Sequence, residues 1–323
     1  MGRKPQRHDV LVRVAELYYI KKKSQQEIAD IMHASRSSIS KMLKTCVDQG
    51  IVEFKVNSLS SSGIRLQHEL KKHFNLKDVV LVSPAETLEE TKSSVGSAAA
   101  DYLESQLQNN LTLGVAWGTT PYLVGSHFNP DTIYDIDVIQ LIGGIGARSI
   151  DTDGQELVKL FQKHFHGTGY VLQAPLIVKN PLIKQMLMEE PEIKNHFKKV
   201  KQVDIALLGL GSNRSNLSAI HKSGHIKKTD ADDMLKMGAV GDVCGTQVDI
   251  NGNVCQTKLS DRVIAIDMDT LLKVPTRIGV AAGPEKADII LASLRGKSVN
   301  VLITDEVAAK KVLEYSTEDS PDE

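Results

Sequence analysis

Glycines and polar side chains follow several short apolar runs of this chain, at positions where ligand chemistry could occur. Gly118, Thr119 and Thr120 come directly after one such run and directly before a helical pattern. A glycine lets the backbone approach a ligand closely, and the hydroxyl and amide groups of threonines at a helix N-terminus suit a phosphate or a sugar. The alternative is an ordinary strand-to-helix turn capped by threonine, and these residues alone do not separate the two interpretations.

Two charged residues are further candidates. Asp242 lies between glycines in GAVGDVCG, where its carboxylate could accept hydrogen bonds from sugar hydroxyls or could close an Asx-turn. Lys286 falls in the first turn of a helical pattern that follows another apolar run. The helix dipole disfavours a cation there unless an anion is also bound, so a bound phosphate is its natural partner.

No signature of a known catalytic or cofactor site is found in the sequence. GGIG at 143–146 and GLGS at 209–212 are expected to be glycine-rich loops after strands, but neither has the spacing of a dinucleotide fingerprint. A Walker A sequence, GxSxG and HExxH are absent, and Cys46, Cys244 and Cys255 lack metal-ligand spacing. The sequence therefore predicts no catalytic residues, no metal and no cofactor.

A sheet must position these candidates. From residue 78 onward, short apolar runs alternate with helical patterns, which predicts a doubly wound, mostly parallel α/β domain whose ligand lies beyond the carboxyl ends of the strands. Asn251 and Gly252 predict a type I′ hairpin within it. We expect strands at 79–82, 111–117, 137–142, 170–178, 203–208, 263–267, 277–282 and 299–304, and helices at about 93–107, 154–166, 181–199, 229–237, 284–295 and 305–315.

The N-terminal region has the layout of a winged helix-turn-helix. A first helix is expected at 9–20, and two further helical patterns, capped by Ser24 and Ser35, precede an alternating strand pattern at 51–56, the expected wing. The buried sides of the two capped helices are expected to consist of Ile28, Ala29, Ile31 and Met32, and of Ile39, Met42, Leu43 and Cys46.

The opposite side of the second capped helix carries short hydroxyl side chains and cationic side chains. Small donors let a helix lie deep in the major groove, while Arg and Lys contact guanine and phosphate. The expected contacts to double-stranded DNA are Gln25, Gln26, Ser35, Arg36, Ser37, Ser40, Lys41 and Lys44. A helical hairpin with a solvated face, and a head that binds another protein, are the alternatives.

Charge is distributed unevenly along the 323 residues. The net charge is −1, yet residues 1–50 carry ten Lys or Arg against five Asp or Glu, which leaves an acidic remainder. This asymmetry favours a basic nucleic-acid-binding head on an acidic body. No apolar run approaches membrane-spanning length and the N-terminus lacks a signal-peptide core, so we expect a cytoplasmic protein without a membrane partner.

The expected organisation has four parts. Residues 1–57 form the winged helix-turn-helix domain, 58–77 a linker and connecting helix, 78–315 the effector domain, and 316–323 an acidic disordered tail. Apolar residues recur every four positions in the connecting helix. Their stripe must be buried against the body or against a second subunit, and the sequence leaves both possibilities open; these residues are Leu66, Leu70 and Phe74.

Over almost its full length the chain resembles the SorC-type family of bacterial sugar-responsive transcriptional regulators. The motifs that carry the resemblance are SQQEIADIMHASRSSISKML, GVAWGTTPYLV, VIQLIGGIG, VDIALLGLGS, GAVGDVCGTQVDINGNV and RIGVAAGPEKADIILASLRGKSVNVLITDE. The resemblance implies a winged head that binds operator DNA, and an effector domain similar to sugar-phosphate isomerases and CoA transferases but without catalysis. It also implies a homo-oligomer, either a tetramer or a dimer.

The resemblance also implies a set of effector contacts, namely Gly118, Thr119, Thr120, Gly143, Gly144, Gln155, Asp242 and Lys286. Some members carry a basic residue just before the glycine pair, where this chain has Ile142. We therefore expect a sugar or a monophosphorylated sugar as the ligand, without a second phosphate site or covalent capture by a lysine there.

These observations predict a DNA-binding regulator of a carbohydrate-utilisation operon whose operator affinity is controlled by that ligand. The alternative is an enzyme, a sugar-phosphate isomerase or deaminase with an added helical head, in which Asp242 and Lys286 serve as acid and base. No pair of base and nucleophile in the sequence supports this alternative.

Overall fold

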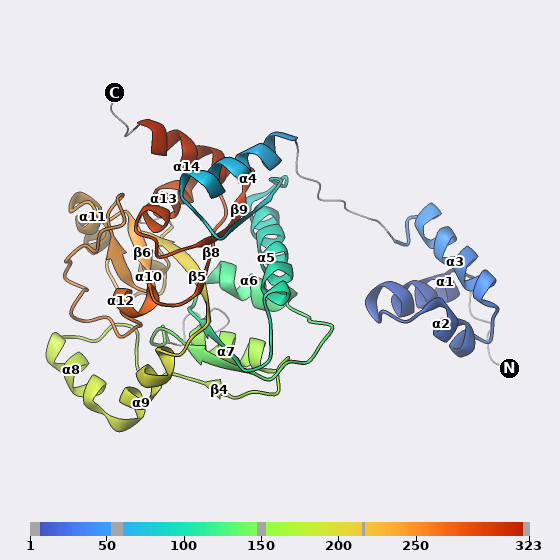
Figure 1. The fold of residues 1–323 in the computed structure, drawn as a ribbon, viewed down its shortest axis with the longest axis horizontal. Coiled ribbons are helices and arrows are strands. Elements are labelled where there is room, and N and C mark those ends of the chain that lie inside the picture. Colours follow the sequence, from blue (N-terminus) through green and yellow to red (C-terminus); the bar gives the residue numbers. More distant parts are fainter. Residues whose placement is uncertain (1–6, 53–60, 147–152, 215–216, 319–323) are drawn as a thin grey trace. The chain divides into compact units, whose positions relative to one another are not determined.

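The computed structural model describes residues 7–52, 61–146, 153–214 and 217–318 (Figure 1). The chain divides into two compact units, Met1–Asn57 and Ser58–Glu323. Within the described residues, no helix is both long enough and apolar enough to cross a bilayer.

The N-terminal unit is a helical bundle. It contains α1 (Arg7–Ala15), which continues into the π-helical turn η1 (Glu16–Ile20), then α2 (Gln25–Met32) and α3 (Arg36–Asp48). Ser24 caps α2 as expected and forms a capping box with Glu27, and Ser35 caps α3 by accepting from Ser38 N–H at 3.1 Å. The tight turn is achieved by His33 in the left-handed conformation, with φ of 51°. The core of this unit contains Val14, Leu17, Ile28, Ala29, Ile39 and Leu43.

One side chain of the head is exposed where we expected it to be buried, and one predicted element lies mostly outside the described residues. Ile31 is 46% exposed instead of buried, because it lies off the helical face that Ile28, Ala29 and Met32 share. Gly50 ends α3 with φ of 68°, as expected of a residue just past a helix. The predicted wing at 51–56 lies outside the described residues from position 53 onward.

The body is built on a mostly parallel sheet with strand order β1-β9-β8-β5-β2-β3-β4. All six pairings along this path are parallel. A short antiparallel hairpin, β6 with β7, extends β5 at its carboxyl end. The strands are β1 (Asp78–Val82), β2 (Leu111–Val115), β3 (Ile136–Gln140), β4 (Gly169–Tyr170), β5 (Ile205–Ser212), β6 (Gly241–Val243), β7 (Thr246–Val248), β8 (Thr276–Val280) and β9 (Val301–Asp305).

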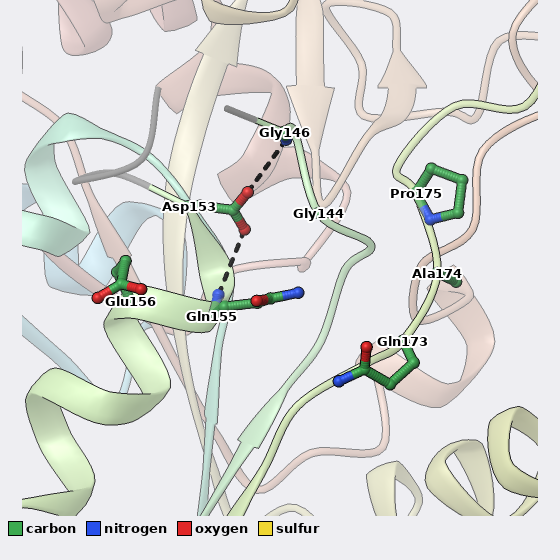
Figure 2. Close-up of a pocket in the computed structure, with 8 residues that line it drawn as sticks. All are labelled: Gly144, Gly146, Asp153, Gln155, Glu156, Gln173, Ala174 and Pro175. Carbon is green, nitrogen blue, oxygen red and sulfur yellow. Dashed lines mark hydrogen bonds between the residues drawn. The ribbon is translucent and has the colours of Figure 1, made fainter. Parts of the chain in front are cut away.

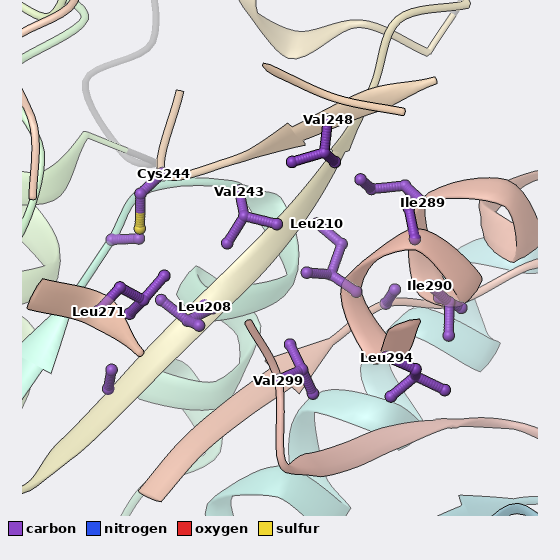
Figure 3. Packing of buried hydrophobic residues seen from close by; sticks show 14 of the residues in the cluster. Leu208, Leu210, Val243, Cys244, Val248, Leu271, Ile289, Ile290, Leu294 and Val299 are labelled. Carbon is purple, nitrogen blue, oxygen red and sulfur yellow. The ribbon is translucent and has the colours of Figure 1, made fainter. Parts of the chain in front are cut away.

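Helices cover both faces of this sheet, and successive strand residues therefore pack in different cores. Leu207 packs in the core that includes α5, α6 and α7, whereas its neighbour Leu208 packs in the core that includes α13 and α14. Figure 3 shows the second core, where side chains of β5, the β6–β7 hairpin and α13 meet. The helices of the body are α4 (Ser61–His73), α5 (Leu88–Ser105), α6 (Thr119–His127), α7 (Gly154–Gln162), α8 (Pro181–Glu189), α9 (Pro191–Val200), α10 (Ala219–Lys222), α11 (Lys228–Lys236), α12 (Met268–Leu271), α13 (Ala287–Arg295) and α14 (Glu306–Glu318).

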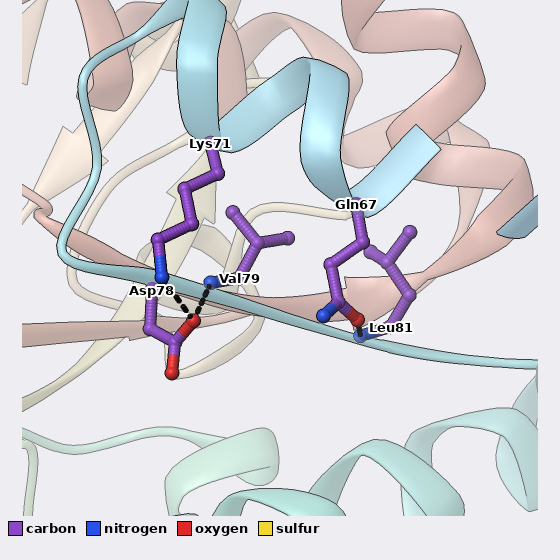
Figure 4. Close-up of polar contacts among 5 residues, drawn as sticks. All are labelled: Gln67, Lys71, Asp78, Val79 and Leu81. Carbon is purple, nitrogen blue, oxygen red and sulfur yellow. Dashed lines mark hydrogen bonds and ion pairs between the residues drawn. The ribbon is translucent and has the colours of Figure 1, made fainter. Parts of the chain in front are cut away.

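The connecting helix α4 packs on its own body. Leu70 is fully buried in the body core, and Leu66 and Phe74 pack against that core. Figure 4 shows the polar contacts beside it: Lys71 Nζ lies 3.0 Å from Asp78 Oδ1, and Leu81 N–H donates to Gln67 Oε1 at 3.4 Å. The stripe whose burial the sequence left open is therefore covered within the subunit.

Two of the expected strands are wrong as continuous strands. The segment 170–178 contains only the last residue of the two-residue β4, Tyr170, although its alternate side chains at 172, 174, 176 and 178 are buried. The alternation is real, but the backbone bonds go to different partners in turn, to Gly144 and then to the segment near Ile264. The predicted strand 263–267 likewise forms only isolated bridges.

Other boundaries shift for local reasons. GLGS is not a loop but the end of β5, where it pairs with β6. The helix expected at 181–199 is two helices, because Pro191 begins a new one at α9. Asn251 lacks the positive φ that a type I′ turn requires; that geometry occurs instead at Cys244 and Gly245, with φ of 51° and 76°, between β6 and β7.

Candidate functional site

A cavity of about 190 Å³ lies at the carboxyl ends of β2, β5 and β8. It brings together five of the predicted effector contacts from three distant parts of the chain: Gly118, Thr119, Thr120, Asp242 and Lys286. Trp117, Ile142, Cys244 and Glu285 are among its other lining residues. This is the place where parallel α/β sheets bind ligands.

The loop after β2 presents the N-terminus of α6 to the cavity. Gly118 is the N-cap residue of α6 and has φ of 131°, a backbone conformation that residues other than glycine rarely adopt. It provides no side-chain cap, so the amide groups of the first turn are not satisfied by a capping side chain. Such amide groups, with the helix dipole behind them, form an anion-binding arrangement.

Asp242 lies on β6, where it closes a turn and also borders the cavity. Gly245 N–H donates to its Oδ2 at 2.9 Å, which closes the β6–β7 turn, and the residue also lines the cavity. Burial raises the pKa of its carboxyl group, while the bond from Gly245 and the charge of Lys286 act in the opposite direction. A carboxylate held in this way can accept from a ligand hydroxyl.

Lys286 ends the short 3₁₀ turn η3 (Pro284–Lys286) and directly precedes α13. Its Nζ donates to the carbonyl oxygen of Leu210 at 2.8 Å, which directs the amine into the cavity. Burial lowers the pKa of Lys286 to about 8, against the favourable charges of Asp242 and Glu285. A bound anion would favour its charged form.

Two further lysines line the cavity and were missed by the sequence reasoning. Lys92 comes from the first turns of α5, and Lys222 ends α10. Both lower the pKa of Lys286 through their positive charge. Each follows the carboxyl end of a strand, β1 and β5 respectively, and this position was the signal that could have identified them.

The remaining predicted contacts lie elsewhere. Gly144 and Gln155 line a separate, open pocket of about 450 Å³ together with Asp153, Glu156 and Gln173 (Figure 2). Asp153 caps α7 and accepts from Ile145 and Gly146 N–H at 3.0 and 3.1 Å, so it ties that helix to the GGIG loop. Gly143 lines neither pocket.

The two glycines of the GG pair have different surroundings, which gives a first prediction. A Cβ at Gly143 would lie 2.5 Å from the carbonyl oxygen of Pro175, whereas one at Gly144 would lie 3.5 Å from Asp153. We expect Gly143→Ala to lower the free energy of unfolding by about 1–3 kcal/mol. Gly144→Ala, the matched control, is expected to cause no loss. Urea denaturation measures both, and equal stabilities of the two variants would contradict this packing.

The predicted DNA-contacting side of α3 is exposed. Ser37, Ser40, Lys41 and Lys44 are exposed, while Ile39, Leu43 and Cys46 on the opposite side are buried. Arg36, at the N-terminal flank of the helix, is exposed as well. Ser35 is occupied as the cap of α3. On α2, Gln25 is half-buried and Gln26 donates to Asp30 Oδ1 at 3.1 Å.

Comparisons with known proteins identify similar sugar-binding domains and transcriptional regulators. The family model described as "Putative sugar-binding domain" (Sugar-bind) matches residues 60–314. The deoxyribonucleoside regulator of Bacillus subtilis (strain 168) is 28% identical over 309 residues, which cover 95% of this chain and 98% of that protein. The sorbitol operon regulator of Klebsiella pneumoniae is 28% identical over 311 residues, 94% of this chain and 97% of that protein.

A solved structure is similar over both units. The full-length sorbitol operon regulator SorC from Klebsiella pneumoniae matches with a TM-score of 0.81 at 27% identity, and the match covers 96% of this chain and 100% of that chain. These relatives are described as regulators and not as enzymes.

Proposed function

The chain belongs to the SorC-type family of sugar-binding transcriptional regulators, and we propose that a sugar or monophosphorylated sugar in the 190 Å³ cavity controls its affinity for operator DNA. The observation that carries this proposal is the meeting, in one cavity, of the uncapped α6 N-terminus, the amine of Lys286 and the carboxylate of Asp242. An anion and a set of hydroxyls are the ligand groups that fit these three partners.

The ligand is proposed to place its phosphate on Thr119 and Thr120 at the start of α6, beside Lys286. Its hydroxyls then reach Asp242. The cavity volume of about 190 Å³ suits a ligand the size of one sugar with one phosphate. Ile142 lines this cavity at the position before the GG pair, and an apolar side chain offers nothing to a second phosphate.

The head is proposed to bind the major groove of an operator through α3. Arg36 and Lys41 contact bases, and Lys44 contacts phosphate, while Ser37 and Ser40 allow close approach. Residues 51–56 are proposed to form the wing. The operator is proposed to control a carbohydrate-utilisation operon, and the protein to act in the bacterial cytoplasm. A homo-oligomer, either a tetramer or a dimer, is proposed to present paired heads to paired half-sites.

The coupling between ligand and operator is proposed to pass through α4, which follows the head in the chain and packs on β1 and α14. A ligand can shift an equilibrium only by its differential affinity for two states, typically about 1–3 kcal/mol. A thermal-shift screen of the purified chain against sugars and sugar phosphates, read together with turnover, tests the proposal. A ligand that stabilises the chain and is not consumed supports it, and one converted to product overturns it.

The charge state of Lys286 gives a pH prediction. With a pKa of about 8, the amine is charged below pH 8 and loses its proton above it. An anionic ligand prefers the charged form, so affinity for a phosphorylated sugar is expected to fall as pH rises from 7 to 9.5, by up to about tenfold per pH unit above 8. Isothermal titration calorimetry across this range measures it. Lys286→Met should show a flat profile, and a flat profile in the unmodified chain would contradict the assignment.

A further inference from the structure

Helix α8 carries an apolar face that its own subunit does not cover. Leu182 and Met186 are 62% and 63% exposed and lie four residues apart, so they share one side of the helix. Leu187 and Met188, on the other side, pack against the core cluster of Leu172, Ala174, Val178, Ile193 and Ile264. None of the residues of α8 is buried. In Figure 1 the helix lies at the edge of the body, next to α9.

This face has no role in the function proposed above. Neither Leu182 nor Met186 lines the ligand cavity, and α8 does not include any predicted DNA contact. A single exposed leucine on a protein surface is ordinary, but neighbouring large apolar side chains on one helix, with Ile183 beside them at 37% exposure, indicate a surface that a partner covers.

We infer that α8 packs antiparallel against α8 of a second copy of this chain, across a two-fold axis. This inference rests on the homo-oligomer proposed above and assigns one of its contacts. In a two-fold contact the same surface is used by both copies, so the surface must be complementary to itself. Leu182 of one copy would then contact Met186 of the other, and the reverse.

The charges at the two ends of α8 are complementary in that arrangement. Lys179 lies just before the helix and Glu190 just after it, and both are exposed. Glu189 already pairs with Lys194 at 2.9 Å, whereas Lys179 and Glu190 form no ion pair with any other residue that the structure describes. Antiparallel packing places the cation of each copy beside the carboxylate of the other, whereas parallel packing would bring like charges together.

The register of the charged and apolar pairs is the same. The midpoint of Leu182 and Met186 is residue 184, and the midpoint of Lys179 and Glu190 falls between 184 and 185. A two-fold axis must cross the helix at a single point, and the two pairs place it within about half a residue of each other. A carboxylate at a helix C-terminus is also disfavoured by the helix dipole, and the N-terminus of the partner helix would relieve this cost.

The molecular mass of the full chain in solution, measured by light scattering, tests the apolar part of the contact. Leu182→Glu with Met186→Glu is expected to lower the mass of the oligomer by a factor of two. Met237→Glu is the matched control, because Met237 is equally apolar and 57% exposed but lies at the end of α11. The control is expected to keep the mass of the unmodified chain.

A charge exchange tests the antiparallel register. Lys179→Glu alone is expected to lower the mass, and Lys179→Glu with Glu190→Lys to restore it. Both changes agree with the dipole of the helix, so a fall in mass would not come from a weakened α8.

Three outcomes would overturn the inference. If the unmodified chain is oligomeric and all α8 variants keep its mass, the inference fails and the proposed homo-oligomer stands. Dissociation by the glutamates without rescue by the double charge exchange rules out the antiparallel register. A monomeric unmodified chain removes both the homo-oligomer and this contact.

Discussion

Replacing Arg36 and Lys41 together with alanine is expected to weaken operator binding by about 30-fold or more at physiological salt. Both side chains are exposed on α3, Lys41 on the side opposite the buried Ile39 and Leu43 and Arg36 at the N-terminal flank of the helix. A well-formed contact to a base edge contributes about 1–3 kcal/mol, so the loss of two such contacts corresponds to a factor of at least about 30. The core of the head contains neither residue, so its fold should be unchanged.

Fluorescence anisotropy with a labelled operator duplex measures this effect. The matched control is Arg13→Ala with Lys310→Ala, which also removes two positive charges, but from α1 and α14. The control should change affinity by less than about tenfold, through net charge alone. Intact operator affinity in the Arg36 and Lys41 variant would contradict the assignment of α3 as the DNA-reading helix. An equal loss of operator affinity in the control would mean that the head binds DNA non-specifically, through its positive charge alone.

Replacing Lys286 with methionine is expected to lower affinity for a phosphorylated sugar by about 100-fold. Methionine keeps an aliphatic stem in place and removes the charge, so the change isolates the interaction with the phosphate. Loss of one partner of a buried charged pair costs about 2–5 kcal/mol. Leu210, whose carbonyl oxygen accepts from Lys286, lines the same cavity, so water can replace the lost donor.

Calorimetric titration measures this loss, and two controls limit its interpretation. Lys236→Met, on the exposed end of α11, should bind the ligand as the unmodified chain does. The unphosphorylated form of the same sugar should lose less affinity with Lys286→Met than the phosphorylated form does. Unchanged affinity of Lys286→Met for the phosphorylated sugar would exclude this cavity as the phosphate site.

The part of the site that sequence reasoning located depends on one rule of sheet geometry. Thr119, Asp242 and Lys286 are far apart in the chain, but each follows an apolar run or lies in a glycine-rich turn beside one. The carboxyl ends of parallel strands meet at one edge, so residues that follow strands converge. Lys92 and Lys222 were not singled out, because a lysine on a helix is in most cases simply solvated.

The parts of the fold that could not be predicted depend on contacts distant in sequence. Glycines normally interrupt a strand, yet GLGS continues β5, because Gly211 lies beneath Asp242 of β6, where a Cβ would be 2.1 Å from Oδ1. The alternation at 172–178 is that of a strand, but whether such a segment forms a continuous ladder depends on its partners. The N-terminal caps of α2 and α3, in contrast, were predictable, because each capping side chain accepts from a backbone amide three residues away.

The most direct test of the central claim is the operator affinity of the unmodified chain and of Lys286→Met, each measured with and without a saturating ligand from the thermal-shift screen. We predict that the ligand changes the operator dissociation constant of the unmodified chain by about 5- to 150-fold. In Lys286→Met the same ligand concentration should leave it unchanged. A ligand that occupies the cavity without altering operator affinity, or that alters it equally in both proteins, would contradict control of DNA binding through this cavity.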